Sequence, residues 1–236
     1  MINTTNLTKK FKKLTSVDNV NISIADNECF ALLGLNGAGK TTLLNMLSTQ
    51  INPTSGTATI NGFDVLKDKN EIRKIINISP QESAVAKNLT VRENLNLIAT
   101  LYQIDNKTEK IEKTIEEFGL KEKENTLCKK LSGGQMRRLS IALAIITEPK
   151  ILFLDEPTLG LDVKARKTLW TIIETLKEKM TIILTTHYLE EVESLADKIA
   201  IISRGKIKAV GTVDEIKQQT GTQTLEQAFI SMTEEE

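Results

Sequence analysis

Short runs of consecutive apolar residues alternate along the chain with longer segments of mixed character. The segment at 20–34 alternates between apolar and polar positions and then becomes continuously apolar, which predicts a hairpin arm leading into a buried strand that ends at Gly34. Compact apolar runs predict further strands at 57–60, 74–79, 150–155, 180–186 and 197–203. Helical segments separate the last three runs, as a parallel, doubly wound sheet requires. The pattern therefore predicts an α/β fold with a mostly parallel core sheet and an N-terminal antiparallel β portion.

The character of the sequence changes at about residues 82–140, where charge is dense and apolar residues recur at helical spacing. We expect one domain over 1–236, with a core of 1–81 and 141–236 and an inserted helical lobe of 82–140. The last stretch predicts a short helical tail with an acidic end. No apolar run suits a signal peptide or a membrane span, so any transport function needs other chains to supply the pathway.

Composition limits the classes of function. The chain has 236 residues, of which 40% are hydrophobic, enough to bury a substantial core. Its 31 basic and 31 acidic residues cancel, so no global positive field favours nucleic acid, and we expect no nucleic-acid partner. Cys29 and Cys128 lie far apart without metal-binding spacing, which favours a reducing compartment and two buried, free thiols.

A glycine-rich loop follows the first buried strand. The sequence "GLNGAGKT" at 34–41 matches the phosphate-loop pattern, in which main-chain N–H groups surround phosphate oxygens. The lysine of the pattern reaches the β- and γ-phosphates, and the threonine hydroxyl ligates magnesium. The alternative is a glycine turn that only starts a helix. The candidate nucleotide contacts are Gly34, Leu35, Asn36, Gly37, Ala38, Gly39, Lys40, Thr41 and Thr42.

Polar residues end two other apolar strands. Asp155 ends the run at 150–155 and Glu156 follows it, so Asp155 is suited to hold magnesium and Glu156 to activate the attacking water. His187, the only histidine, follows the run at 180–186 and is placed to sense the γ-phosphate. Without this context, two solvated acids and a structural histidine are the alternatives. Catalysis is therefore predicted for Lys40, Glu156 and His187.

A second glycine-containing helix start lies at 131–135, "LSGGQ". A simple N-capped helix would explain Ser132 but not both glycines that follow it. The order of all these segments resembles the ATP-binding cassette ATPases, the nucleotide-binding subunits of ABC transporters, over nearly the whole chain. In this resemblance "LSGGQ" is the family signature, "LGLD" at 159–162 the D-loop, and Gln81 in "SPQES" the Q-loop.

The resemblance implies ATP and Mg²⁺ as the bound species and adds residues to the site. Gln81 is expected to contact both nucleotide and metal, beside the metal ligands Thr41 and Asp155. Phe11 in "KKFKKL" matches the aromatic residue that stacks on adenine. The alternative for Phe11 is a core anchor of the first strand.

The resemblance also implies a reason for two glycine sites in one chain. Two such ATPases pair head to tail, as a homodimer or with a related ATPase, and each signature covers the nucleotide of the other chain. The residues expected to serve the partner's ATP are Ser132, Gly133, Gly134, Gln135 and Asp162.

The implied function is ATP-driven export through separate integral membrane permease subunits. The permease is expected to dock near 82–100, with Gln81 as the link to the nucleotide. The run from 34 to 65 is most similar to exporters of the drug, antibiotic or lipid type. The implied location is cytoplasmic, on the inner face of the cell membrane. The alternative is a soluble cassette ATPase without a permease, such as the iron–sulfur cluster assembly type.

Overall fold

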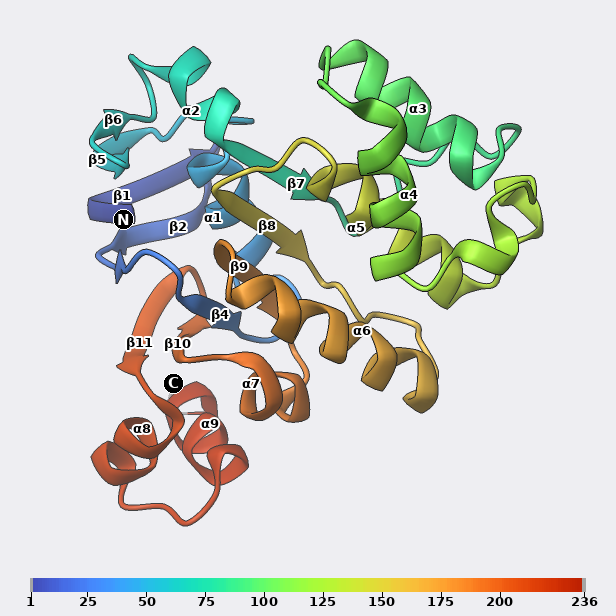
Figure 1. Ribbon diagram of the computed structural model, residues 1–236. Helices are drawn as coiled ribbons and strands as arrows, with labels where there is room; N and C mark the ends of the chain where they lie inside the picture. The colour runs from blue at the N-terminus through green and yellow to red at the C-terminus, as the bar shows by residue number, and fades with distance from the viewer. Residues whose placement is uncertain (1, 235–236) are drawn as a thin grey trace.

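The computed structural model describes residues 2–234, which form two sheets and surrounding helices (Figure 1). The larger sheet has the strand order β11-β10-β4-β9-β8-β7, and its neighbours are parallel except for the edge pair β10 and β11. Its strands are β4 (Cys29–Leu33), β7 (Ile76–Ser79), β8 (Ile151–Asp155), β9 (Thr181–Thr186), β10 (Lys198–Ser203) and β11 (Lys206–Gly211). The predicted mostly parallel core sheet is confirmed.

The smaller sheet is antiparallel and comes from the N-terminal part of the chain, as predicted. A long hairpin of β1 and β2 forms one side, and β5 and β6 follow on the other side of β1. The bounds are β1 (Ile2–Phe11), β2 (Leu14–Val20), β3 (Ser23–Ile24), β5 (Ser55–Ile60) and β6 (Phe63–Asp64). The prediction of a strand at 74–79 began two residues early, because Lys74 and Ile75 complete a helix before β7 starts.

Helices cover the larger sheet and build the lobe at the upper right of Figure 1. The core helices are α1 (Lys40–Leu47), α2 (Lys69–Ile75), α5 (Gly133–Ile145), α6 (Val163–Lys177) and α7 (Leu189–Leu195). The lobe contains α3 (Val91–Leu101) and α4 (Lys107–Glu117), followed by 3₁₀ turns at Lys121–Lys123 and Cys128–Lys130. The expected boundary at 140 falls inside α5, a single helix that starts beside the lobe and packs on β7 and β8.

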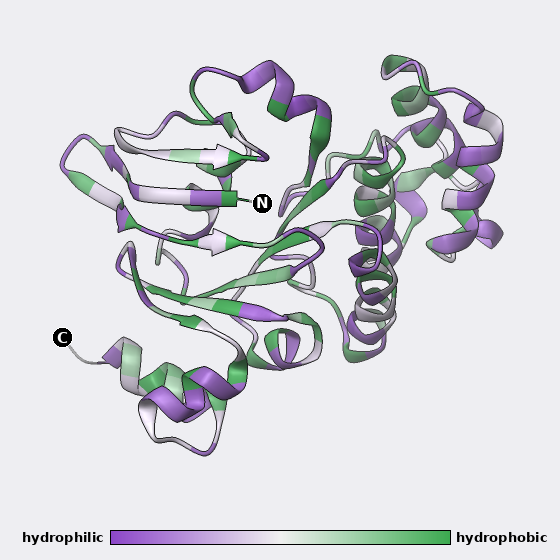
Figure 2. Cartoon of the chain, turned by 60° about the vertical axis from the view of Figure 1, so that its left-hand side comes forward, coloured by the Kyte–Doolittle hydropathy of each residue, from purple (hydrophilic) through white to green (hydrophobic). Residues whose placement is uncertain are grey.

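The two faces of the larger sheet bury two hydrophobic clusters. On β4, Cys29, Ala31 and Leu33 belong to the cluster under α5, α6 and α7, whereas Phe30 and Leu32 belong to the cluster under α1 and the smaller sheet. A strand buried on both faces needs a continuous apolar run, which explains the pattern in the sequence. Figure 2 shows these hydrophobic strands inside the molecule and hydrophilic residues along the outer helices. Cys29 and Cys128 are buried and free, as expected.

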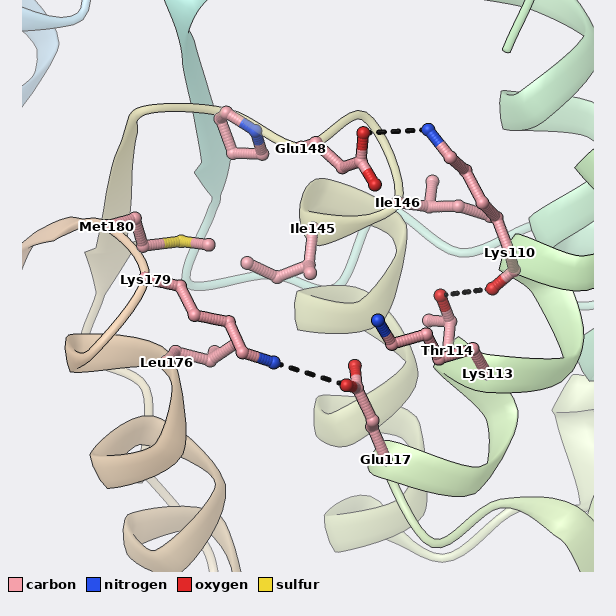
Figure 3. Close-up of a pocket in the computed structure, with 11 residues that line it drawn as sticks. Lys110, Lys113, Thr114, Glu117, Ile145, Ile146, Glu148, Leu176, Lys179 and Met180 are labelled. Carbon is pink, nitrogen blue, oxygen red and sulfur yellow. Dashed lines mark hydrogen bonds and ion pairs between the residues drawn. The ribbon is translucent and has the colours of Figure 1, made fainter. Parts of the chain in front are cut away.

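A cavity of about 190 Å³ lies between α4, α5 and α6, where the lobe meets the core (Figure 3). Lys110 on α4 pairs with Glu148 at 2.7 Å, and Lys179 after α6 pairs with Glu117 at 3.3 Å. Ile145 and Met180 contribute apolar surface to the same cavity. Buried lobe residues such as Ile111 share one hydrophobic cluster with the core, so apolar packing as well as these ion pairs attaches the lobe.

The C-terminal tail is helical, as predicted, and consists of α8 (Val213–Thr220) and α9 (Leu225–Glu234). Its acidic end continues into 235–236, which lie outside the described residues. No helix among residues 2–234 combines the length and apolar character that crossing a lipid bilayer requires.

Candidate active site

Three neighbouring parallel strands end at the same edge of the larger sheet and carry the predicted residues. Gly34 follows β4, His187 follows β9, and Asp155 is the last residue of β8. Because β9 lies between β4 and β8, these residues converge on one place. Ligands of open α/β sheets bind at such carboxyl ends of strands.

The glycine loop holds the start of α1 in a conformation that needs Gly39. This residue has φ 106°, and a Cβ atom there would lie 2.4 Å from the carbonyl oxygen of Ser16. Glycine alone tolerates both conditions. The ammonium of Lys40, the first residue of α1, lies inside the loop and donates to the carbonyl oxygens of Gly34 at 2.7 Å and Leu35 at 3.2 Å.

The loop borders a hollow of about 450 Å³, a volume within the usual range of small-molecule sites. Predicted residues from four separate segments meet here. The hollow is lined by Leu14, Ser16, Asn36, Gly37, Ala38, Gly39, Lys40, Thr41, Thr42, Gln81, Glu156, Leu159 and His187. Phe11 is not among these residues, although its cross-strand partner Leu14 is. Phe11 is 46% exposed, which excludes the core-anchor alternative and leaves adenine stacking a prediction.

The first carboxylate, Asp155, is 5% exposed and accepts two hydroxyl hydrogen bonds through Oδ1. Thr41 donates from 3.1 Å and Thr185 from 2.5 Å. Within residues 2–234, no group of three or more His, Cys, Asp or Glu residues could enclose a metal ion. The paired oxygens of Thr41 and Asp155 nevertheless suit magnesium, which takes one or two protein oxygens together with substrate phosphates and water.

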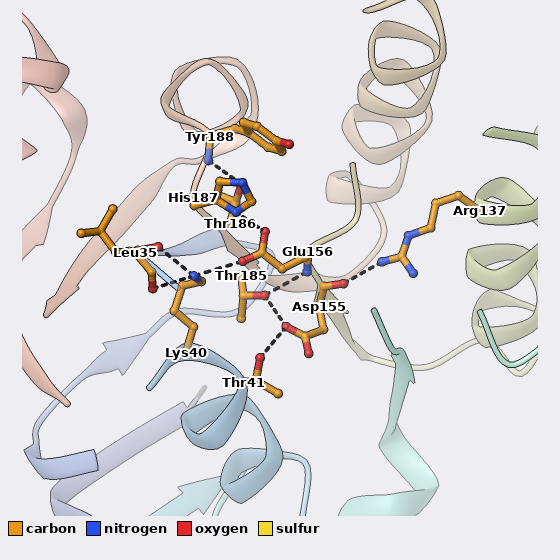
Figure 4. A network of polar contacts seen from close by, with 11 residues as sticks. Leu35, Lys40, Thr41, Arg137, Asp155, Glu156, Thr185, Thr186, His187 and Tyr188 are labelled. Atoms are coloured by element: carbon orange, nitrogen blue, oxygen red, sulfur yellow. Dashed lines mark hydrogen bonds and ion pairs between the residues drawn. The ribbon is translucent and has the colours of Figure 1, made fainter. Parts of the chain in front are cut away.

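The second carboxylate, Glu156, lies between the lysine and the histidine (Figure 4). Its Oε1 is 3.0 Å from Lys40 Nζ, and its Oε2 is 2.8 Å from His187 Nδ1. Glu156 is 7% exposed and has φ 45°, a left-handed conformation that is uncommon for residues other than glycine. Strained backbone of this kind is typical of functional sites, and it persists only where the surroundings hold it.

Two residues that the sequence analysis did not identify hold the carboxylate segment. The buried hydroxyl of Thr185 on β9 accepts from Glu156 N at 2.9 Å while it donates to Asp155. Arg137 on α5 donates to the carbonyl oxygens of Asp155 and Pro157, each at 2.8 Å. Each had a signal in the sequence. Thr185 belongs to the "TT" that ends an apolar run, and Arg137 lies at helical spacing from Ser140, which is buried.

The signature forms a second hollow of about 340 Å³, separate from the first. Ser132 is the N-cap of α5 and makes a capping box with Gln135, so a plain helix cap accounts for these two residues. Asp162 caps α6 by accepting from Ala165 N at 2.8 Å. The residues of this hollow are Ser132, Gly134, Gln135, Arg138, Asp162, Lys164, Ala165 and Thr168. The structure thus brings most of the residues expected to serve a partner's ATP together, away from Lys40.

The two signature glycines differ in their surroundings. A Cβ atom at Gly134 would lie 2.9 Å from the Cβ of Ala165, so this glycine permits the close approach of α5 and α6. A Cβ atom at Gly133 would meet nothing within 4 Å among the described residues. Glycine in a helix costs roughly 0.5–1 kcal/mol relative to alanine. No contact within the described part of this chain explains Gly133.

These features define the class of the protein. A buried strand, a glycine loop and an inward lysine at a helix start, opposite a strand that ends in a carboxylate, are the parts of a phosphate-loop nucleotide hydrolase. Residues 17–159 match the family model described as ABC transporter, and residues 129–193 match one described as an AAA domain. The chain belongs to the ABC transporter family, in which it is an ATP-binding ATPase subunit.

Individual relatives agree with this assignment. The chain is 38% identical to the daunorubicin/doxorubicin resistance ATP-binding protein DrrA of Streptomyces peucetius, over 95% of this chain and 69% of that protein. It is also 38% identical to the phospholipid-transporting ATPase ABCA3 of Homo sapiens, over 89% of this chain but 12% of that protein.

Solved structures show the same fold. An ATP-binding subunit of an ABC transporter superimposes with a TM-score of 0.88 at 27% identity, over 98% of this chain and 99% of that one. A dimeric, post-hydrolysis state of the cassette MJ0796 bound to ADP and Pi superimposes with a TM-score of 0.81 at 25% identity, over 90% of this chain and 98% of that one. The predicted family, fold and ATPase activity are therefore confirmed.

Proposed function

We propose that the chain powers export by hydrolysing ATP in a closed dimer, with each ATP held between the phosphate loop of one chain and the signature of the other. The observation that carries this proposal is the separation of the two hollows in one chain. Lys40 and Glu156 line one hollow, and Ser132 and Asp162 line the other. A head-to-tail dimer joins them into two complete sites.

Surface features around the hollows support this arrangement. Leu35, Leu159 and Val163 are large apolar residues that are 59%, 41% and 59% exposed, and they flank the glycine loop and the D-loop. Such exposed apolar residues favour an interface. The open side of Gly133 leaves its main chain accessible to the partner's γ-phosphate. The partner is a second copy of this chain or a related ATPase.

Within its own site, the chain is equipped to bind phosphate and activate water. We assign the β- and γ-phosphates to Lys40 and the main-chain N–H groups of 34–42. A γ-phosphate at Lys40 replaces Glu156 as the acidic partner of the ammonium. Glu156 is then free to accept a proton from the attacking water, and His187 orients this carboxylate from 2.8 Å.

Magnesium is assigned to Thr41 and Asp155, with Gln81 as a further oxygen donor at the rim of the same hollow. When bound, the ion neutralises charge on the phosphates during phosphoryl transfer. The hydroxyl of Thr185 donates to Asp155 Oδ1, so the Asp155 carboxylate keeps one orientation. Stacking on the adenine ring of ATP is assigned to Phe11, which is exposed at the end of β1 near the hollow.

The proposed docking region for integral membrane permease subunits lies near 82–100, at the start of the inserted lobe. Leu97, Leu101 and Tyr102 on or next to α3 are 42%, 66% and 59% exposed, and they offer an apolar surface. Gln81 lines the nucleotide hollow and directly precedes this region in the sequence. The names of the relatives, a drug-resistance protein and a phospholipid-transporting ATPase, support a role in transport. Export and a place on the inner face of the cell membrane are part of the proposal.

Mixed dimers test the shared sites. Lys40→Ala removes the phosphate clamp of one chain, and Ser132→Arg blocks the signature of the other. Each variant alone should be inactive, because every site in its homodimer contains one broken half. In a mixed dimer one site contains both lesions, whereas the other joins native Lys40 to native Ser132. ATP hydrolysis and ATP-dependent dimer formation should therefore return on mixing, with turnover below half of the native value.

Two controls accompany this experiment. Circular dichroism of each variant establishes that it is folded, and differently tagged chains establish that mixed dimers form. Mixed dimers without any recovered hydrolysis would contradict the shared-site proposal. Co-purification of the native chain with an integral membrane protein separates the transporter function from a permease-free cassette ATPase.

A further inference from the structure

Arg137 is a buried charged residue to which no contact with ATP or magnesium is assigned above. It lies on α5, one helical turn after Gly133, and is 5% exposed. Its Nε donates to Pro157 O and its Nη2 to Asp155 O, each at 2.8 Å, and its Nη1 donates to Pro80 O. Figure 4 shows the side chain reaching from α5 to the end of β8. All three acceptors are main-chain oxygens.

The positions of these acceptors give Arg137 its significance. Asp155 and Pro157 are the residues on either side of Glu156, and Pro80 precedes Gln81. One guanidinium therefore fixes the peptide groups that flank the proposed general base and the start of the Q-loop. Glu156 itself has a left-handed backbone, so its side-chain direction depends on how firmly these flanking peptides are held.

The guanidinium is almost completely buried. Burial lowers the pKa of Arg137 to about 10 although the negative charges of Asp155 and Glu191 act in the opposite direction, so the group remains charged at neutral pH. Burying this charge is costly, and an apolar side chain of similar size would fill the space without that cost. Arginine provides what an apolar residue lacks, a planar set of donors that fixes several oxygens at once.

The helix that carries Arg137 also carries the signature. Gly133 and Arg137 lie on successive turns of α5, about 6 Å apart along the helix axis. One turn further, the hydroxyls of Ser140 and Ser79 lie 3.1 Å apart and join α5 to the end of β7. A shift of the signature end of α5 therefore moves the donors that hold Pro80, Asp155 and Pro157.

We propose that Arg137 is a positioning residue that sets Glu156 and Gln81 of its own chain according to the position of its own signature. This inference rests on the proposed dimer function. A partner's nucleotide at Ser132 and Gly133 then acts through α5 on the hydrolytic group of the chain that carries the signature. The two sites of the dimer are coupled by one side chain in each chain.

Mixed dimers with a single active site test this role. In the reference dimer, one chain is native and supplies Lys40 and Glu156, and the other carries Lys40→Ala and supplies its signature. Arg137→Met is placed either in the chain with the active Glu156 or in the chain that lends its signature. Tandem affinity purification with two tags isolates each mixed dimer.

The two placements have different expected results. With Arg137→Met beside the active Glu156, kcat should fall at least about tenfold while the KM for ATP changes by less than about threefold, because placement rather than binding is lost. With Arg137→Met in the signature chain, kcat should stay within about threefold of the reference dimer. Arg137→Lys beside Glu156 should recover part of kcat, since an ammonium replaces some of the three hydrogen bonds.

Controls separate this proposal from loss of folding and from failure of the dimer. Arg73→Met is the control for loss of a guanidinium elsewhere, because the exposed Arg73 also donates to a main-chain oxygen, that of Thr49, away from the site. If Arg137→Met does not fold, Arg137→Lys in the two placements provides the same comparison. Equal kcat for the two placements, or a loss confined to the signature placement, overturns the proposal. A reference dimer without turnover indicates instead that the shared-site function itself is wrong.

Discussion

The hydroxyl of Thr185 offers a direct test of how the carboxylate segment is held. Thr185→Val removes this hydroxyl while keeping the shape and volume of the side chain. In the native chain the hydroxyl donates to Asp155 Oδ1 at 2.5 Å and accepts from Glu156 N at 2.9 Å, and Thr185 is fully buried. The variant therefore loses two hydrogen bonds without leaving a cavity.

The size of the effect follows from these contacts. A buried hydrogen bond to a charged group contributes about 1.5–3 kcal/mol, and a neutral one contributes less. Glu156 N keeps a second acceptor, Thr185 O at 3.2 Å, so its loss is partial. We expect the free energy of unfolding to fall by about 2–3 kcal/mol. For a chain of this length, the melting temperature should fall by roughly 4–12 °C.

Activity should fall as well, because Asp155 and Glu156 both lose a fixed orientation. We expect kcat to decrease about tenfold to hundredfold. Thermal unfolding and steady-state ATP hydrolysis measure the two effects. Thr181→Val is the control: Thr181 is a buried threonine at the other end of β9 whose hydroxyl accepts from Asn27 N at 2.9 Å. It should lose about 1 kcal/mol and keep its kcat. The reasoning is refuted if both variants have the same stability and the same turnover.

Other changes test other parts of the structure. Glu156→Gln should lower turnover on the order of a hundredfold to ten-thousandfold and leave the chain dimeric in sizing chromatography with ATP and magnesium, whereas a persistent monomer would contradict the closed dimer. Burial raises the pKa of the fully buried Glu191. The folded chain therefore binds a proton at Glu191 more tightly than the unfolded chain does. The free energy of unfolding of the native chain, compared with that of Glu191→Gln, should fall as pH rises from the ordinary glutamate pKa through the raised value. Parallel stability curves in urea between pH 4 and pH 8 would disprove this. Burial also raises the pKa of the Cys29 thiol to about 12 and that of Cys128 above its ordinary value. Iodoacetamide at neutral pH should therefore modify both thiols only after unfolding, and rapid labelling of the folded chain, detected by mass spectrometry, would be contrary evidence.

The parallel core was predictable because its strands are buried on both faces and therefore appear as continuous apolar runs. The edge strand β11 was not predicted, since its residues alternate irregularly between exposed and buried positions. The first strand, β1, contains polar residues at most positions and is defined by its pairing with β2 and β5. Such strands form because they pair with segments far away in the sequence, and a local pattern of apolar and polar residues does not contain this information.

The candidate site likewise contains residues that the sequence predicted and residues that it did not. Residues assigned to phosphate or metal belong to motifs with fixed spacing, so Lys40 and Asp155 could be proposed from sequence alone. Thr185 and Arg137 were not, because their partners are mainly main-chain groups, which every residue possesses. Arg137 lies on the buried face of α5, and the three carbonyl oxygens that it contacts come from two distant segments. Only the folded chain brings these oxygens together.

The left-handed backbone of Glu156 has an evolutionary consequence. A left-handed conformation costs roughly 1–2 kcal/mol for a residue with a Cβ atom, whereas glycine avoids this strain and asparagine tolerates it better. Replacing Glu156 by either residue relieves the backbone, but it also removes the carboxylate that lies 3.0 Å from the buried ammonium of Lys40. Leaving a buried charge without its partner costs about 3–5 kcal/mol, which is more than the strain. A library of this chain selected only for heat resistance should therefore retain glutamate at 156. The strained residue is thus kept by selection for stability as well as by selection for hydrolysis.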